Sequence, residues 1–361
     1  MDSREREGPS SWDCAGSFKK ESRMIKKILF LVLAALAFLP SYVAASETPP
    51  SLTVKGLVEQ PLKLTLADLG AFSSITVQLN EIMKDGGFQG NFYYRGVPLR
   101  NLLETARIKK KRKNFFKGID LAFAVRNKEG KQVVLSWGEI FYRNPATIVI
   151  AVSAQPIMPH ADCKSCHDAD FTKRWLAPLH RKVGFPKLVV NSDTWSDRSL
   201  DNITEIEVLD LKPDLPSQKM KELQSPEFEI SGPGVTSVTV KDLSSFSRIK
   251  TRVSTVGEGK GYHGTQDVSG APFKAVVEQQ LSKPDLNSAF LVSAPDGYRS
   301  VLSYGEVFLS PAGERVLLVD TINNEPVKEN GKFIMMPPDD VMADRWIKAV
   351  SKIEWIPLPH K

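Results

Sequence analysis

Two stretches of this chain, Val134-Leu-Ser-Trp-Gly-Glu139 and Val301-Leu-Ser-Tyr-Gly-Glu306, differ only in their aromatic residue. Upstream of each, Leu66-Ala-Asp-Leu69 corresponds to Val240-Lys-Asp-Leu243 in the same order. Similar segments that recur in a fixed order are typical of an internal repeat. A chain of 361 residues is also long enough for two domains with hydrophobic cores. The sequence therefore predicts two copies of one fold.

Each copy is expected to be mostly β. Short runs rich in β-branched residues and bounded by turn formers predict strands at residues 52–56, 119–125, 132–135, 147–152 and 187–190. Residues 98–106 and 272–281 instead begin with Pro and carry apolar residues at helical spacing. We expect an α+β class with two tandem β-rich folds, over residues 47–212 and 227–361, joined by a polar linker at 213–226.

Residues 1–46 read as a targeting segment and not as part of the fold. Met24 opens a positively charged stretch, residues 28–39 are an unbroken apolar run, and small residues up to Ala45 suit cleavage. The run is shorter than the roughly 20 residues that span a bilayer, which favours a cleaved signal peptide over an uncleaved anchor. Residues 1–23 are then an upstream extension, and we expect a periplasmic protein with no stable membrane insertion.

After the signal, the only cysteines are Cys163 and Cys166, and His167 follows directly. Attachment of a c-type haem needs two thiols that reach the porphyrin vinyl groups and an adjacent imidazole that binds iron. Export and the lack of any other cysteine support this interpretation. The sequence predicts one haem c, held covalently by Cys163 and Cys166, with His167 as the proximal iron ligand.

The Cys-x-x-Cys-His motif lies in a segment that the second copy lacks. Between the Ser-Trp-Gly or Ser-Tyr-Gly motif and the pairs Asp197-Arg198 and Asp344-Arg345, the first copy is longer by about 20 residues. Loops on a rigid scaffold commonly carry chemistry, so an inserted motif favours function. The Asp-Arg pairs recur in both copies, and we expect them to fix a shared turn.

Other interpretations of the motif remain open. Zinc could use His160, Cys163, Cys166 and His167, although adjacent Cys and His side chains rarely converge on one tetrahedral centre. A local disulfide between Cys163 and Cys166 is a further alternative, either redox-active or structural. The strand-then-helix setting of a thioredoxin-like site is missing from the sequence.

The sixth iron ligand is less defined. We favour His180, because it follows His167 at a distance that lets a short helix return a side chain to the iron. Met158 and His160 precede the motif, His263 lies in the other copy, and an open site is the remaining alternative. A methionine would raise the reduction potential, and a second histidine would lower it.

Four segments of the first copy form a longer pattern: Leu52-Thr-Val-Lys-Gly-Leu-Val, Leu64-Thr-Leu-Ala-Asp-Leu, Gly96-Val-Pro-Leu-Arg-Asn-Leu-Leu and Ile203-Thr-Glu-Ile-Glu-Val. This pattern resembles the molybdopterin-binding domain of the sulfite oxidase family of oxidoreductases. The resemblance covers nearly all of residues 52–211 and, more weakly, 227–356. It implies a sulfite-oxidase-type fold for both copies.

The chain departs from that family at the metal ligand. The family's enzymes hold molybdenum through a cysteine thiolate between the Asp-Leu and Gly-Val-Pro-Leu segments. Here residues 75–80 and 251–256 occupy that interval, and neither contains a cysteine. Gln78 or Ser254 would not replace a soft thiolate without changing the metal's electronic character. We therefore expect no bound molybdopterin and a fold that is kept as a scaffold.

The charge pattern bears on partners. Six of the seven residues from Arg107 to Lys113 are basic, which would suit an acidic redox partner or an anionic lipid surface, or form a solvated loop. The small net charge does not indicate nucleic acid. The sequence predicts an exported electron-transfer protein with one haem in preference to a catalytic oxidoreductase. The alternatives are a divergent molybdenum oxidoreductase that passes electrons to its own haem, and a non-catalytic binding module.

Overall fold

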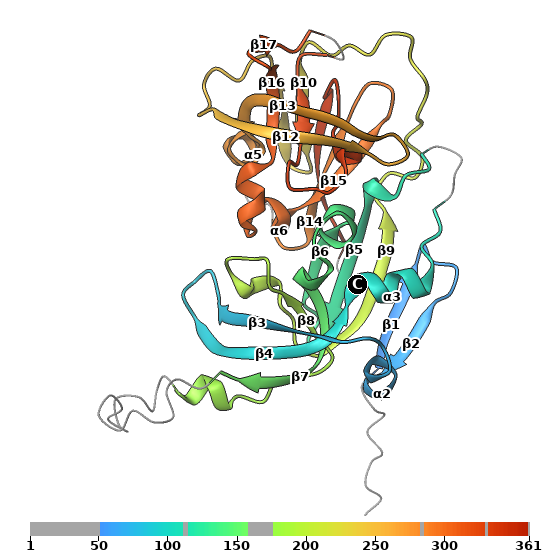
Figure 1. Cartoon of the computed structure of the whole chain (residues 1–361), viewed down its shortest axis with the longest axis vertical. Coiled ribbons are helices and arrows are strands. Elements are labelled where there is room, and N and C mark those ends of the chain that lie inside the picture. Colours follow the sequence, from blue (N-terminus) through green and yellow to red (C-terminus); the bar gives the residue numbers. More distant parts are fainter. Residues whose placement is uncertain (1–50, 111–114, 158–175, 282–284, 329–330, 360–361) are drawn as a thin grey trace, which may run out of the picture. The chain divides into compact units, whose positions relative to one another are not determined.

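The computed structural model describes residues 51–110, 115–157, 176–281, 285–328 and 331–359. Figure 1 shows two groups of strands that follow one another along the chain. We call residues 51–210 the first repeat and residues 228–357 the second repeat. Residues Pro49–Lys361 form one unit, so contacts between the repeats are part of the fold.

The first repeat contains two sheets. A five-stranded sheet has the order β2 (Leu62–Thr65), β1 (Ser51–Gly56), β9 (Ile203–Asp210), β5 (Leu121–Asn127) and β6 (Gln132–Ser136). A four-stranded sheet has the order β3 (Ile75–Ile82), β4 (Phe88–Pro98), β7 (Ile148–Pro156) and β8 (Lys187–Val190). Only the pairing of β1 with β9 is parallel among these strands.

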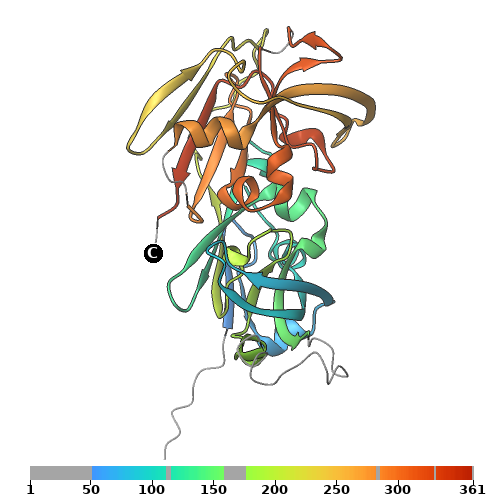
Figure 2. The ribbon, with the colours of Figure 1, turned by 90° about the vertical axis from the view of Figure 1, so that its left-hand side faces the viewer.

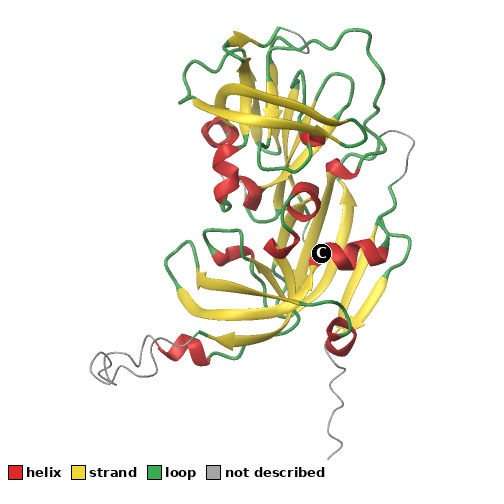
Figure 3. Ribbon diagram, in the orientation of Figure 1, coloured by secondary structure: helices red, strands yellow, loops and turns green. Residues whose placement is uncertain are grey.

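The second repeat has the same two-sheet plan (Figure 3). Its first sheet has the order β11 (Val235–Val240), β10 (Phe228–Gly232), β19 (Lys352–Pro357), β14 (Ser288–Ser293) and β15 (Arg299–Ser303). Its second sheet has the order β12 (Ile249–Gly257), β13 (Gly261–Pro272), β16 (Leu317–Ile322) and β17 (Glu325–Pro326), and β18 (Ile334–Met336) also pairs with β16. The parallel pair is again the one between the first and last strands, β10 and β19. The predicted tandem β-rich α+β fold is confirmed.

Helices within the described ranges are few and short. The α-helices are α2 (Leu66–Gly70), α3 (Leu99–Ala106), α5 (Phe273–Gln280) and α6 (Tyr304–Phe308). Further helical turns lie at Gly118–Asp120, Gly138–Tyr142, Pro145–Thr147, Ala177–His180, Ser196–Arg198, Pro311–Arg315 and Ala343–Arg345. Both helices predicted after a proline are present, because Pro98 and Pro272 fix the backbone that precedes α3 and α5. No helix in the described ranges is long and apolar enough to cross a membrane.

Each repeat has its own hydrophobic core. In the first, Leu103 of α3 packs with Phe123 and Ile150 of the two sheets. In the second, Phe273 of α5 packs with Phe290 in an equivalent cluster. A further buried cluster joins the repeats, because side chains of β5 and β6 pack against side chains of β14 and β15: Ala122, Ala124, Val134, Ala289, Leu291 and Val301. This apolar contact holds the two repeats together.

The repeats differ in one connection. In the first repeat, residues 157–186 join β7 to its neighbour β8, whereas residues 323–333 make the equivalent link from β16 to β18 in the second. The longer connection is the insertion predicted from the sequence. Its central part, residues 158–175, lies outside the described residues, as does the predicted signal peptide.

Candidate functional site

The predicted haem-binding residues fall in the long connection between β7 and β8. Cys163, Cys166 and His167, with Met158 and His160, lie outside the described residues. The structure does describe the two points at which this segment leaves and rejoins the first repeat. Both points lie on β4, so the sheet fixes the two ends of the segment.

The segment leaves the sheet at Ile157, whose backbone N–H donates to the carbonyl oxygen of Asn91 at 2.8 Å. It rejoins the sheet through the helical turn Ala177–His180, which packs on β4. Gly90 permits this approach, because a Cβ atom there would lie 3.1 Å from the Pro178 carbonyl oxygen and closer still to the Phe92 ring. A side chain at Gly90 would collide with the Phe92 ring and press against the returning segment.

Arg181, directly after the turn, ties the returning segment down. Its Nε donates to the carbonyl oxygen of Gln89 at 2.9 Å, and its Nη1 lies 2.8 Å from Asp201 Oδ2. Its Nη2 forms an ion pair with Glu81 of β3. The guanidinium also lies over the Phe92 ring, 5.5 Å from the centroid. The end of the segment thus has partners on β3, on β4 and in the loop before β9.

Arg181 belongs to a buried ionic cluster, which we define as Glu81, Tyr94, Arg181, Lys187 and Asp201. Lys187 is 1% exposed, and its Nζ lies 2.5 Å from Asp201 Oδ1 and 3.3 Å from Glu81 Oε1. The Tyr94 hydroxyl donates to Glu81. Burial, reinforced by the Glu81 carboxylate, raises the pKa of Tyr94 far above its ordinary value, so this phenol stays protonated.

Asp201 is the charged acceptor at the rim of this cluster. Burial alone would raise its pKa, but Lys187, the Gly184 N–H and Arg181 outweigh burial and lower the pKa below its ordinary value. Asp201 is therefore a carboxylate at neutral pH. Its negative charge holds the Arg181 end of the segment against the sheet.

Two of the candidate sixth ligands are described. His180 is exposed at the end of its helical turn, directly before Arg181. His263 is exposed on β13 in the second repeat. In Figures 1 and 2, β13 and β4 belong to different strand groups. Of the two, His180 is the one next to the segment.

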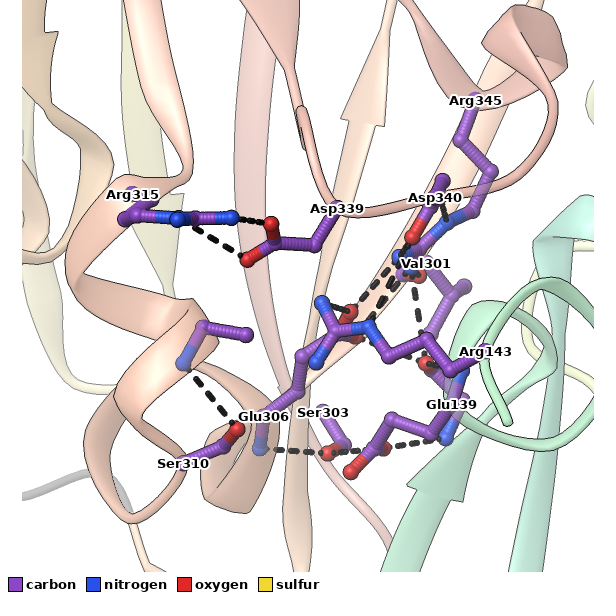
Figure 4. Close-up of polar contacts among 12 residues, drawn as sticks. Glu139, Arg143, Val301, Ser303, Glu306, Ser310, Arg315, Asp339, Asp340 and Arg345 are labelled. Atoms are coloured by element: carbon purple, nitrogen blue, oxygen red, sulfur yellow. Dashed lines mark hydrogen bonds and ion pairs between the residues drawn. The ribbon is translucent and has the colours of Figure 1, made fainter. Parts of the chain in front are cut away.

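The recurrent Gly-Glu and Asp-Arg motifs meet across the boundary between the repeats. Ser136 Oγ donates to Glu306 Oε2 of the second repeat at 2.7 Å. In return, Ser303 Oγ donates to Glu139 Oε2 of the first repeat at 2.7 Å (Figure 4). Arg198 also reaches across and donates to Ser303 Oγ at 3.1 Å. The two halves of this network exchange equivalent hydrogen bonds.

Each half has a fully buried arginine between two acids. Arg198 lies 2.7 Å from Glu139 and 2.7 Å from Asp193. Its counterpart, Arg345, lies 2.6 Å from Glu306 and 2.6 Å from Asp340 (Figure 4). Arg143 approaches the same two carboxylates, at 2.9 Å from Glu306 and 3.6 Å from Asp340. We call these side chains, with Ser136 and Ser303, the inter-repeat network.

Glycines next to the glutamates make room for this network. A Cβ atom on Gly138 would lie 1.9 Å from Cζ of Arg345, and one on Gly305 would lie 2.1 Å from Nε of Arg198. The Asp-Arg pairs do form the shared turns predicted for them. The contact between the turns and the Gly-Glu motifs was not predicted from the sequence, although opposite charges recur at these positions in both copies.

Comparison with known proteins addresses the first repeat. The family model of the oxidoreductase molybdopterin binding domain matches residues 44–160. The predicted resemblance is thereby confirmed for that part of the chain, and the duplicated topology gives the second repeat the same plan. The match ends before Cys163, so it says nothing about the motif.

Two further comparisons concern curated proteins and solved structures. Among curated proteins, none matches this chain. The crystal structure of the sulfane dehydrogenase SoxCD from Paracoccus pantotrophus is similar over 86% of this chain and 78% of that one, with 15% sequence identity and a TM-score of 0.31.

Within the described residues, the positions that correspond to the family's metal ligand carry no soft donor. Gln78 and Ser254, in the intervals where the family places its thiolate, are exposed residues of β3 and β12. The described ranges contain no cysteine and no group of three or more His, Cys, Asp or Glu side chains arranged to hold a metal. Amide and hydroxyl groups do not supply a soft ligand, so these residues do not fit the metal.

The basic stretch at residues 107–113 is partly structural. The Lys110 side chain is 6% exposed and forms ion pairs with Asp120 and Asp210. Lys109 is exposed and lies 3.6 Å from Glu59. Lys110 therefore stabilises the fold and does not face a partner, while residues 111–114 lie outside the described ranges.

Proposed function

We propose that this chain is an exported electron-transfer protein with one c-type haem, attached through Cys163 and Cys166 and with His167 bound to iron. The observation that carries the proposal is the Cys-x-x-Cys-His motif in a connection that the second repeat lacks. Its two cysteines are the only ones after the expected signal peptide. The fixed ends of the connection would give an attached group a defined place.

A bound c-type haem supplies reversible one-electron chemistry. We assign the chain's own residues the following roles. The two thiols attach the group, His167 and, in our proposal, His180 bind its iron, and Arg181 holds the end of the segment that carries His180. We propose export to the periplasm and a redox partner protein, acidic if it docks near the exposed Arg107 and Lys109.

Covalent attachment is tested with the full chain, exported by a host that matures c-type cytochromes. We expect a pyridine haemochrome spectrum of c type that survives acid-acetone extraction. The double variant Cys163→Ala/Cys166→Ala should lose this spectrum, and Cys14→Ala, which lies ahead of the signal, should keep it. A colourless wild-type protein would refute the proposal and favour a module with a structural cysteine pair.

The sixth ligand is tested by a matched pair of histidine variants. We expect His180→Ala to change the low-spin absorption spectrum and the reduction potential of the covalent haem, whereas His263→Ala leaves both unchanged. His180→Met should raise the potential, because a thioether favours ferrous iron. An unchanged spectrum in His180→Ala would transfer the role to Met158, His160 or an open site.

A second candidate is a divergent molybdenum oxidoreductase that passes electrons to its own haem. The family-model match at residues 44–160 favours it, and the missing thiolate opposes it. Elemental analysis separates the two. Close to one molybdenum atom per chain would support the enzyme, and much less than one would exclude it.

A further inference from the structure

The second repeat contains a hollow of about 500 Å³ between β13, β18 and the chain around Trp346. Thr255, His263, Gln266 and Lys348 line it together with Trp346. A second hollow of about 520 Å³ shares four of these five residues and continues from the first. The space is large enough for a small organic molecule.

Strand register identifies which residues of the first repeat correspond to those that line the hollow. Gln266 is paired with Val253 across β12 and β13, as Phe92 is paired with Leu79 across β3 and β4. One turn-closing hydrogen bond also recurs at the same length: the Glu258 N–H donates to Asp344 at 2.9 Å, and the Lys84 N–H donates to Asp197 at 2.9 Å. The two places can therefore be compared residue by residue.

In the first repeat, side chains fill the position that corresponds to the hollow. The Phe92 ring stands where the second repeat has Gln266, and Arg181 covers that ring. Asp201 stands at the position of Lys348, which follows the Asp-Arg pair at the same interval. The ionic cluster thus occupies, in the first repeat, the space that is a hollow in the second repeat. One member of the cluster, Arg181, comes from the long connection.

The lining of the hollow combines an apolar floor with a charged rim, in which the one carboxylate, that of Glu325, is paired with Lys328 at 3.8 Å. Ile334 and Met336 are buried below the hollow, and Trp346 packs against the same apolar cluster. Lys348 and His263 are exposed at the rim. Within the ranges that the structure describes, the Lys348 ammonium has no ion-pair partner. A positive charge beside an apolar wall and an indole suits an anion with an apolar body.

We propose that this hollow binds a small organic anion that has a planar apolar body and one carboxylate or sulfonate group. The body packs on Trp346 and the floor, and the anionic group pairs with Lys348, with His263 as a further donor. This site lies in the second repeat and does not depend on haem attachment. It would give the repeat without the motif a binding function of its own.

Equilibrium dialysis of the full chain against anilinonaphthalenesulfonate tests the proposal, because the free probe is measured outside the protein. We expect one probe per chain. Lys348→Gln should weaken binding about tenfold by removing the charge-assisted contact. Gln266→Phe, which copies the ring of the first repeat, should weaken binding about as much by filling the space.

Lys63→Gln is the matched control, since it removes an exposed lysine from β2 of the first repeat. It should leave the dissociation constant within about twofold of wild type. An unmeasurable affinity in wild type, equal affinity in Lys348→Gln and wild type, or equal weakening in the control would each overturn the proposal. Unchanged unfolding midpoints of the variants would exclude a general loss of structure.

Discussion

The region around β4 in the first repeat and the region around β13 in the second have the same strand pairing but different side chains. Glu81, Lys187 and Asp201 close the first with buried ion pairs, whereas His263 and Lys348 line an open hollow in the second. The two repeats share a backbone arrangement, but their side chains at matched positions differ. In the first repeat these side chains fill the space and hold the end of the long connection, and in the second repeat they leave a hollow.

The inter-repeat network, in contrast, has the same glutamate and arginine pair in both repeats. Glu139 and Arg198 of one repeat are matched by Glu306 and Arg345 of the other, and both pairs are buried. Burial alone would raise the pKa of Glu306, but Arg345 and Arg143 outweigh it and lower the pKa. A buried charge needs a partner of opposite charge, because an unpaired one is strongly destabilising. This requirement explains why the glutamate and arginine positions are alike in the two repeats, while the regions around β4 and β13 differ.

The largest expected effect comes from breaking this network. Arg198→Ala should lower the free energy of unfolding by about 3–5 kcal/mol, because it leaves two buried carboxylates without their partner. Arg345→Ala should cost somewhat less, since Arg143 stays 2.9 Å from Glu306. Denaturant unfolding of the full chain measures both. The exposed Arg315→Ala is the control, with an expected loss below about 0.5 kcal/mol.

A smaller effect is expected when the first region is made like the second. Lys187→Ile copies Ile334 and should lower the free energy of unfolding by about 2 kcal/mol, because Glu81 and Asp201 lose a buried partner. Adding Glu81→Thr, which copies Thr255, should cost less than the two single losses combined. Additive losses would contradict the coupling that the ionic cluster requires.

Acid should weaken the first region selectively. Because the folded pKa of Asp201 is lowered, its contribution to stability is complete above the ordinary pKa of about 4 and is lost as pH falls through the folded value. We expect Asp201→Asn to cost about 1 kcal/mol at pH 7 and to reduce the acid dependence of unfolding. Parallel stability curves for variant and wild type between pH 5 and pH 2 would contradict this role.

The smallest effect is expected on the exposed strands. Arg252 of β12 pairs with Asp267 on the surface, and Gln78 stands at the matched position of β3. Arg252→Gln should change the free energy of unfolding by less than about 0.5 kcal/mol, since exposed ion pairs contribute little. A loss of unfolding free energy above about 1 kcal/mol would instead show that the Arg252–Asp267 pair stabilises the fold.

Local patterns in the sequence predicted the elements well. The β-branched runs at residues 119–125 and 132–135 became β5 and β6, and Pro98 precedes α3 as expected. The repeat was predictable because the same short motifs recur in order. Each of these patterns spans only a few consecutive residues, so it can be recognised in a single sequence.

The contacts between distant residues were not predictable in the same way. Glu81, Arg181 and Asp201 are far apart in the chain, and each reads as an ordinary polar residue until strand pairing brings them together. Lys110 lies in a basic run that was interpreted as either a docking surface or a solvated loop, yet its side chain is buried against Asp120. The haem-binding assignment of Cys163, Cys166 and His167 stays a prediction from the motif.

Intact-mass spectrometry of the exported chain tests the central proposal most directly. With active c-type maturation, we expect the mass of the polypeptide without its signal segment plus one haem, and the bare mass in Cys163→Ala/Cys166→Ala. The bare polypeptide mass in the wild-type protein would contradict covalent haem and, with it, the proposed electron-transfer role.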